Sequence, residues 1–148
     1  VIKPKYLLTV MKKYILVILI LISGCVEKTG YYSDGEENVI SLICDNTWIT
    51  KKTVDDDGIT HHAIYNYKKD GTYSRKSITT GKDGQVKESS INGRWAFTDQ
   101  SSKTLYFGSD HYWDIEELTS KKFAVYDRWG EYGQLDMSRE YLELTPLK

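Results

Sequence analysis

The acidic and histidine residues of this chain are the first candidates for metal chemistry. The run Asp55-Asp56-Asp57-Gly58 could supply carboxylates to calcium, but an EF-hand loop needs alternating acids and a distant glutamate, and the run has neither. His61 and His62 are adjacent, and adjacent residues on a strand point to opposite faces. A metal site that combined His111 with His61 or His62 would draw one histidine from each of two separate strands. We therefore interpret the acidic run as a solvated turn and expect no metal site.

Carboxylates and hydroxyl groups offer no pattern for catalysis. Asp114 and Glu116 share one face of an expected strand whose other face carries Trp113 and Ile115, so both acids are expected to point outward into solvent. Glycoside hydrolysis needs two acids facing each other across a cleft, and no spacing selects such a pair. No Gly-x-Ser-x-Gly nucleophile elbow and no glycine-rich phosphate loop occurs. The sequence therefore predicts a protein that is not an enzyme and uses no cofactor.

Aromatic residues in two connections form the most suggestive remaining group. The segment Trp129-Gly130-Glu131-Tyr132-Gly133 lies in a long connection between expected strands, and His111 and Tyr112 lie at another. Connections alternate between the two ends of an antiparallel meander, so both belong to the same end. We predict that Trp129, Tyr132, Tyr112 and His111 bind a small apolar or aromatic molecule at this mouth. The alternative is that Trp129 and Tyr132 plug the opening or pack on its rim.

The elements that must position these residues are antiparallel strands. From Thr47 onward, residues typical of β-structure dominate, and the Asp-Gly pairs at 57–58, 70–71 and 83–84 supply the positive φ angles of tight turns. Asn92-Gly93 is interpreted as a kink within one long strand, with a hairpin turn as the alternative. We predict eight strands, at about 47–54, 60–68, 72–79, 85–98, 103–107, 112–118, 122–127 and 138–145.

A short helix is expected ahead of the strands, at about 36–44. Asp34 and Glu37 have the spacing of a capping box, and apolar residues recur behind them at helical spacing. Cys44 ends this segment and is interpreted as a buried, inert thiol.

One face of the expected strands carries nearly all the large apolar side chains. Burial at every second residue is typical of a sheet with one face in a core, and with almost no helix to cover it the sheet must curl onto itself or pair with a second sheet. An up-and-down barrel is the simplest closure, and its narrow interior would be largely filled by aromatic rings. The expected inward residues are Trp48, Thr50, His61, Ala63, Tyr65, Tyr67, Ile91, Gly93, Trp95, Phe97, Leu105, Phe107, Trp113, Ile115, Phe123, Val125, Leu142 and Leu144.

A series of short motifs resembles the lipocalin-like domain of small bacterial lipoproteins. The resemblance covers most of residues 36–146 and implies an all-β, antiparallel, up-and-down barrel of eight strands, the calycin type, for most members without an established ligand. Lipocalins proper carry Gly-x-Trp on the first strand, and Asn46 stands here in place of that glycine. The motifs are Asn46-Thr47-Trp48, Tyr67-Lys68-Lys69-Asp70-Gly71-Thr72-Tyr73, Gly93-Arg94-Trp95, Lys103-Thr104-Leu105, Trp113-Asp114-Ile115-Glu116-Glu117-Leu118-Thr119 and Lys122-Phe123-Ala124-Val125.

The N-terminal segment resembles a bacterial lipoprotein signal. Lys12 and Lys13 precede the apolar run 15–22, which is shorter than the about 20 residues of a membrane-spanning helix, and small residues stand before a cysteine, as in a secretory signal. Leu21-Ile22-Ser23-Gly24-Cys25 fits the lipobox pattern at every position. The resemblance implies cleavage before Cys25, lipid transfer to its thiol, and acylation of the new amino terminus, for example with palmitate.

The expected organisation has three parts: a signal peptide at 1–24, with 1–10 as an upstream extension; the lipidated cysteine and a tether at 25–35; and the barrel domain at 36–148. Loss of the signal removes four lysines, leaving 16 basic against 21 acidic residues, a net charge of −5. This charge argues against a nucleic-acid partner. Val26 provides no aspartate-type signal for inner-membrane retention, which favours the outer membrane.

Together these features predict a lipid-anchored, non-enzymatic protein of the bacterial cell envelope. Its expected partners are the membrane, through the lipid on Cys25, and a small hydrophobic ligand at the barrel mouth. The alternative is a filled barrel that acts as a scaffold, a protein-binding accessory subunit of an envelope complex.

Overall fold

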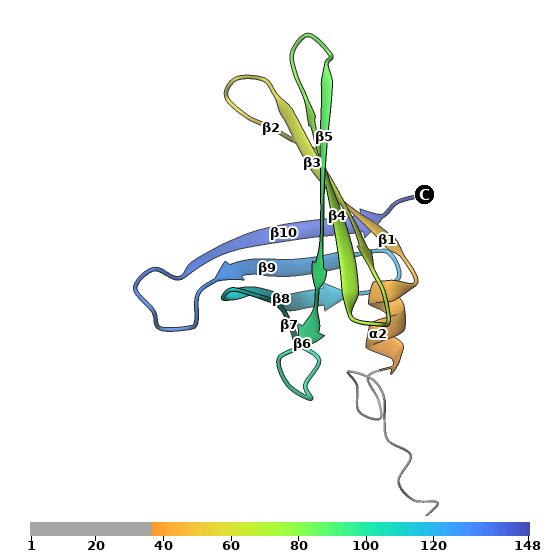
Figure 1. The fold of residues 1–148 in the computed structure, drawn as a ribbon, viewed down its shortest axis with the longest axis vertical. Coiled ribbons are helices and arrows are strands. Elements are labelled where there is room, and N and C mark those ends of the chain that lie inside the picture. Colours follow the sequence, from red (N-terminus) through yellow and green to blue (C-terminus); the bar gives the residue numbers. More distant parts are fainter. Residues whose placement is uncertain (1–36) are drawn as a thin grey trace, which may run out of the picture.

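The computed structural model describes residues 37–148, which form one short helix and an antiparallel sheet of ten strands (Figure 1). All eight predicted strands are present, but the first and the fourth are each interrupted. The prediction of an all-β fold with a short preceding helix is confirmed. The elements are α2 (Glu37–Cys44), β1 (Thr47–Thr50), β2 (Thr53–Val54), β3 (Thr60–Tyr67), β4 (Thr72–Thr80), β5 (Val86–Arg94), β6 (Ala96–Phe97), β7 (Thr104–Gly108), β8 (His111–Leu118), β9 (Phe123–Trp129) and β10 (Ser138–Pro146).

The strands pair in the order of a curled meander. From one side of the sheet to the other the order is β5-β4-β3-β1-β10-β9-β8-β7-β6, with β2 paired to β3. Every strand except β1 pairs with a chain neighbour, and β1 pairs with β3 and with the last strand, β10. This is the neighbour pattern of an up-and-down barrel.

A bend at Trp95 joins the two ends of this sheet. β5 pairs with β4, and β6 pairs with β7, although only Trp95 separates β5 from β6. The backbone N–H of Trp95 donates to the Gly71 carbonyl oxygen at 2.9 Å, and its indole Nε1 donates to the Lys68 carbonyl oxygen at 3.1 Å. β5 runs through Asn92-Gly93 without a turn, so a hairpin at that pair is excluded.

Beyond this bend the barrel is open. β3, β4 and β5 extend as one arm, and β7, β8, β9 and β10 extend as a second arm in a different direction (Figure 1). Residues 37–148 therefore form no closed barrel mouth. The two connections beside the predicted site residues, after β7 and after β9, lie at the end of the second arm. We call the two arms the β3–β5 arm and the β7–β10 arm.

The inward side chains explain why the arms separate. Near the bend they are large and apolar, as with Tyr67 on β3, Phe123 on β9 and Leu144 on β10, all buried. Toward the loop ends the same face carries polar and charged residues, such as Ser77, Asp127 and Glu140. Hydrophobic burial stabilises contact between the arms only where apolar surface is present on both. Ile91, expected in the interior, is accordingly 50% exposed.

The helix α2 closes the packed end. Ile40 and Ile43 are buried in the same cluster as Trp48, Trp113 and Phe123. The indole Nε1 of Trp48 donates to the Ile43 carbonyl oxygen at 2.9 Å, which satisfies one carbonyl at the helix C-terminus. The predicted capping residue Asp34 lies outside the described residues, as does Cys25. Within the described part, no helix has the length and apolar character needed to cross a membrane.

Candidate binding cleft

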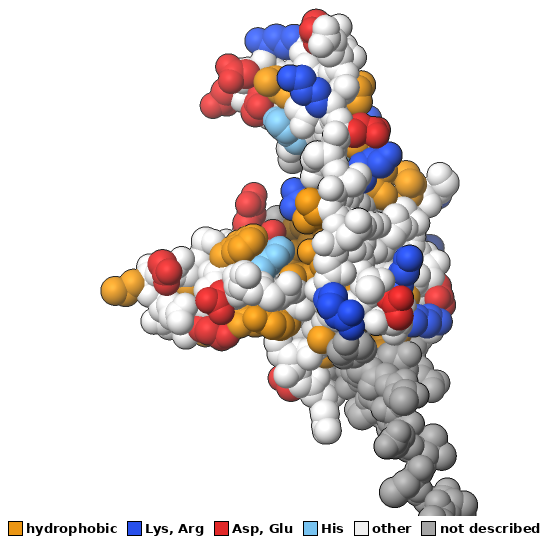
Figure 2. All heavy atoms as spheres, viewed as in Figure 1, with side chains coloured by type: hydrophobic (Ala, Val, Ile, Leu, Met, Phe, Trp, Pro, Cys, Tyr) orange, Lys and Arg blue, Asp and Glu red, His pale blue; other side chains and the backbone are white. Residues whose placement is uncertain are grey.

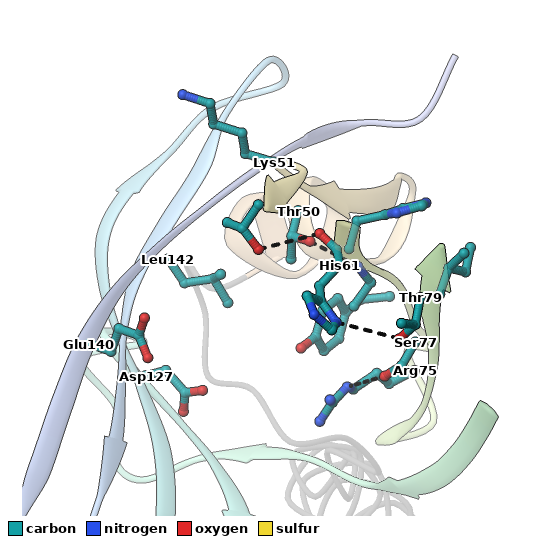
Figure 3. A pocket seen from close by; sticks show the side chains of 14 residues that line it. Thr50, Lys51, His61, Arg75, Ser77, Thr79, Asp127, Glu140 and Leu142 are labelled. Atoms are coloured by element: carbon teal, nitrogen blue, oxygen red, sulfur yellow. Dashed lines mark hydrogen bonds between the residues drawn. The ribbon is translucent and has the colours of Figure 1, made fainter. Parts of the chain in front are cut away.

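A cleft lies between the two arms, on the inner face of the sheet. In Figure 2 the surface is hollowed between the arms. Two adjoining hollows of about 310 and 340 Å³ make up this cleft, and both are lined by Tyr65, Arg75 and Asp127. Arg75 and His61 come from the β3–β5 arm, and Asp127, Glu140 and Leu142 from the other (Figure 3).

Aromatic rings form the wall of the larger hollow. The rings of His111 and Trp129 stack with centroids 4.1 Å apart and an interplanar angle of 6°. Phe107 packs against His111 at 4.9 Å, and Tyr73 against Phe107 at 5.1 Å. Trp129 keeps 50% of its surface exposed. The structure therefore brings two of the predicted site residues, His111 and Trp129, together on the cleft side of the sheet.

The floor of the cleft carries the hydroxyl group of Tyr65 and two opposite charges, those of Arg75 and Asp127. Tyr65 is 8% exposed, and within the described residues its hydroxyl makes no hydrogen bond. Burial raises the pKa of Tyr65 to about 12, so the group remains a neutral donor at physiological pH. Asp127 Oδ1 accepts a hydrogen bond from Nε2 of His111 at 2.6 Å. Arg75 Nε donates to Ser77 Oγ at 3.1 Å.

The smaller hollow is lined by polar groups of the β3–β5 arm. His61 lies 2.9 Å from Asp55 and 3.4 Å from the Thr79 hydroxyl. The hydrogen bonds from His61 and from the Ile59 backbone lower the pKa of Asp55. Asp55 belongs to the turn that the sequence predicts to be solvated. Among residues 37–148, no group of three or more potential ligands is placed to hold a metal ion.

Tyr112 and Tyr132, the other two predicted ligand-binding residues, lie on the outer face of the sheet. Their rings flank the side chain of Arg128, whose Cζ is 4.2 and 4.3 Å from the two ring centroids. The hydroxyl of Tyr112 donates to Glu131. Because His111 and Tyr112 are adjacent on β8, the alternation of strand side chains sends them to opposite faces. The structure therefore places Tyr112 and Tyr132 on the face of the sheet opposite to His111 and Trp129.

The carboxylate of Asp114 is also placed differently from the prediction. Asp114 does point outward, but its side chain is only 13% exposed because Arg128 and Tyr132 cover it. Arg128 Nε and Nη2 donate to its two oxygens at 2.9 and 3.2 Å. Burial alone would raise the pKa of Asp114, but hydrogen bonds from Arg128 and Tyr132 outweigh it and the pKa is lowered. Asp114 is therefore the partly buried partner of the buried Arg128 in an ion pair.

Cys44 is less buried than the sequence predicts. Its thiol is free and partly exposed. Burial raises its pKa to about 11, so the nucleophilic thiolate is scarce at neutral pH.

Arg75 and Asp127 are the cleft residues that the sequence reasoning missed. Both occupy inward positions by strand parity: Arg75 pairs with Tyr65, and Asp127 follows Phe123 and Val125 at every second residue. That parity was available in the sequence, and it would have marked both as charged residues on a face otherwise expected to be apolar.

No protein-family model matches this chain, no curated protein matches it, and no solved structure matches it.

Proposed function

We propose that this chain is a non-enzymatic binding protein of the bacterial envelope, which takes up a small aromatic or apolar molecule in the cleft between its arms. The observation that carries the proposal is the half-exposed indole of Trp129, stacked on His111 beside a hollow of about 340 Å³. Ligand pockets typically occupy about 300–1,000 Å³ and combine apolar walls with a few polar groups. The cleft lies at the lower end of this range and has both kinds of lining.

The aromatic wall offers a flat surface with a specific geometry. A ring stacked on Trp129 gains about 0.5–1.5 kcal/mol beyond the burial of its area. Because His111 already covers one side of the indole, a ligand ring would continue an existing stack rather than order a mobile side chain. Such preorganisation reduces the entropy cost of binding.

Binding can be tested with N-phenyl-1-naphthylamine, a neutral aromatic probe whose fluorescence rises in apolar surroundings. We expect saturable binding to the purified protein, weakened about tenfold by Trp129→Ala. Tyr141→Ala is the matched control, because Tyr141 is similarly exposed, at 46%, on the outer face of β10. Uptake of the probe by an attached lipid is the same in both variants. Absence of saturable binding, or equal binding by the two variants, would refute the proposal.

The envelope location rests on the N-terminal sequence, in which Leu21-Ile22-Ser23-Gly24-Cys25 has the lipobox pattern. In cells grown with a labelled fatty acid, the wild-type protein should be labelled and retained in the membrane fraction. The Cys25→Ala variant should lose both properties. Labelling that persists in this variant would exclude Cys25 as the lipid site.

A second candidate function, a protein-binding accessory subunit of an envelope complex, is favoured by the outer face of the β7–β10 arm. Tyr106, Tyr132 and Tyr141 are 38%, 60% and 46% exposed there, and tyrosine is enriched in protein interfaces. Crosslinking in intact cells should capture one specific envelope protein, and Tyr132→Ala should reduce its recovery. Recovery of the chain alone would count against this function.

A further inference from the structure

Arg75 is a cation of the candidate cleft that forms no ion pair within the described part of the chain. It lies on β4 between Tyr65 of β3 and Ile91 of β5 in the strand register, so the three side chains share the inner face. Its one hydrogen bond to another side chain is the contact of Nε with Ser77. Within residues 37–148, no carboxylate lies within ion-pair distance of its guanidinium group. The two terminal nitrogens are therefore available to a bound molecule.

A second donor lies beside this cation. The Tyr65 hydroxyl has no hydrogen-bond partner in the described part of the chain, although Tyr65 is more than nine-tenths buried. Tyr65 and Arg75 line both hollows. The hydroxyl oxygen is open to the cleft and not fully enclosed, so an acceptor on a ligand can reach it.

The carboxylates of Asp127 and Glu140, across the cleft, do not occupy the donors of Arg75 and Tyr65. Asp127 accepts a hydrogen bond from His111 of its own arm at 2.6 Å, and within residues 37–148 it forms no ion pair with Arg75. Glu140 lies on β10 and is exposed to solvent, where water screens its charge. An anionic group on the floor would therefore meet one open guanidinium and one open hydroxyl.

We propose that the ligand of this cleft is a planar aromatic molecule bearing a carboxylate, with its ring on the Trp129–His111 stack and its carboxylate on Arg75 and Tyr65. The inference rests on the proposed function and specifies its ligand class. The planar fork of a guanidinium matches the two oxygens of a carboxylate. Arg75 and Trp129 line the same hollow from opposite arms, so one small molecule can contact both.

The test compares naphthalene-2-carboxylate with naphthalene-2-carboxamide, which keeps the ring and shape but has no charge. Affinities for the purified protein are measured by isothermal titration calorimetry. We expect the carboxylate to bind at least tenfold more tightly, which is the range of a charge-assisted hydrogen bond. Arg75→Gln should abolish this preference without weakening the carboxamide, and Tyr65→Phe should reduce it several-fold.

Lys76→Gln is the matched control for charge. Lys76 follows Arg75 on β4, lies on the outer face and pairs with Glu88 at 3.1 Å. Its loss changes the net charge equally, so the preference for the carboxylate should remain. Equal binding of both probes, or a preference that survives in Arg75→Gln, would overturn the inference while the proposed function stands. Failure of both naphthalene probes to bind would also overturn the inference, and the binding of N-phenyl-1-naphthylamine then decides the proposed function separately.

Discussion

Replacing Asp114 by Asn should destabilise the fold strongly, although the residue lies outside the core cluster. The guanidinium of Arg128 is buried, with a side chain 4% exposed, and Asp114 neutralises it through two hydrogen bonds. Removing one partner of a buried ion pair leaves an uncompensated charge and costs about 3–5 kcal/mol. Because Arg128 also donates to the Gly130 carbonyl oxygen and lies between two tyrosine rings, we expect a loss at the lower end, about 3 kcal/mol.

The assay is urea unfolding followed by tryptophan fluorescence. The midpoint should fall with an unchanged m-value, and the melting temperature should drop by about 10 °C. Glu116→Gln is the control, since Glu116 is an exposed carboxylate on the same strand and its loss should cost less than about 0.5 kcal/mol. A loss below about 1 kcal/mol for Asp114→Asn would refute the view that this pair is a buried structural element.

Acidification provides a second test of this pair, because the pKa of Asp114 is lowered in the folded state. The stability that its carboxylate contributes is present above the unfolded pKa of about 3.9 and is lost as the pH falls through the lower, folded pKa. The difference in urea midpoint between wild type and Asp114→Asn should therefore shrink from pH 6 to pH 3, and a constant difference would contradict the assignment. Gly93→Ala should destabilise by about 1–3 kcal/mol, because a Cβ there would lie 2.6 Å from Cε1 of Tyr73; thermal melting of Gly93→Ala in the wild-type and in the Tyr73→Ala background tests this clash, because loss of the ring should relieve it, and an equal destabilisation in both would contradict it. Cys44, with a pKa of about 11, should react slowly with Ellman's reagent at pH 8 in the folded protein and much faster in urea; equal rates would show that the fold does not protect the thiol.

The strands were predictable because local signals agree along most of the chain. The pairs Asp70-Gly71 and Asp83-Gly84 mark real turns with φ values of 82° and 77° at the glycines, and Trp48, Trp113 and Leu144 occupy the predicted inward positions. Local patterns of this kind depend on neighbours in sequence. They determine where strands begin and end, and which face of each strand is apolar.

Two features of the structure do not follow from local patterns: the barrel is open, and the four predicted site residues lie on two different faces of the sheet. Barrel closure depends on whether apolar surface continues along every strand at once, and the change from Val125 to Asp127 and from Leu142 to Glu140 interrupts it on two neighbouring strands. His111 and Trp129 line the inner hollow of about 340 Å³, whereas Tyr112 and Tyr132 lie on the outer face. Proximity along the chain suggests one group of four, but strand parity separates adjacent residues onto two faces.

Because β5 extends far beyond the bend at Trp95, a small rotation at the bend produces a larger displacement at the far end of the strand. β5 has nine residues, so at about 3.3 Å per residue its far end lies roughly 30 Å from the bend. A rotation of about 5° there displaces that end by roughly 3 Å, nearly the thickness of an aromatic ring. Trp95 is 3% exposed and packs edge-on against Tyr67 and Phe97. Small changes in packing around this one indole, far from the cleft, are therefore magnified into the width of the opening between the arms.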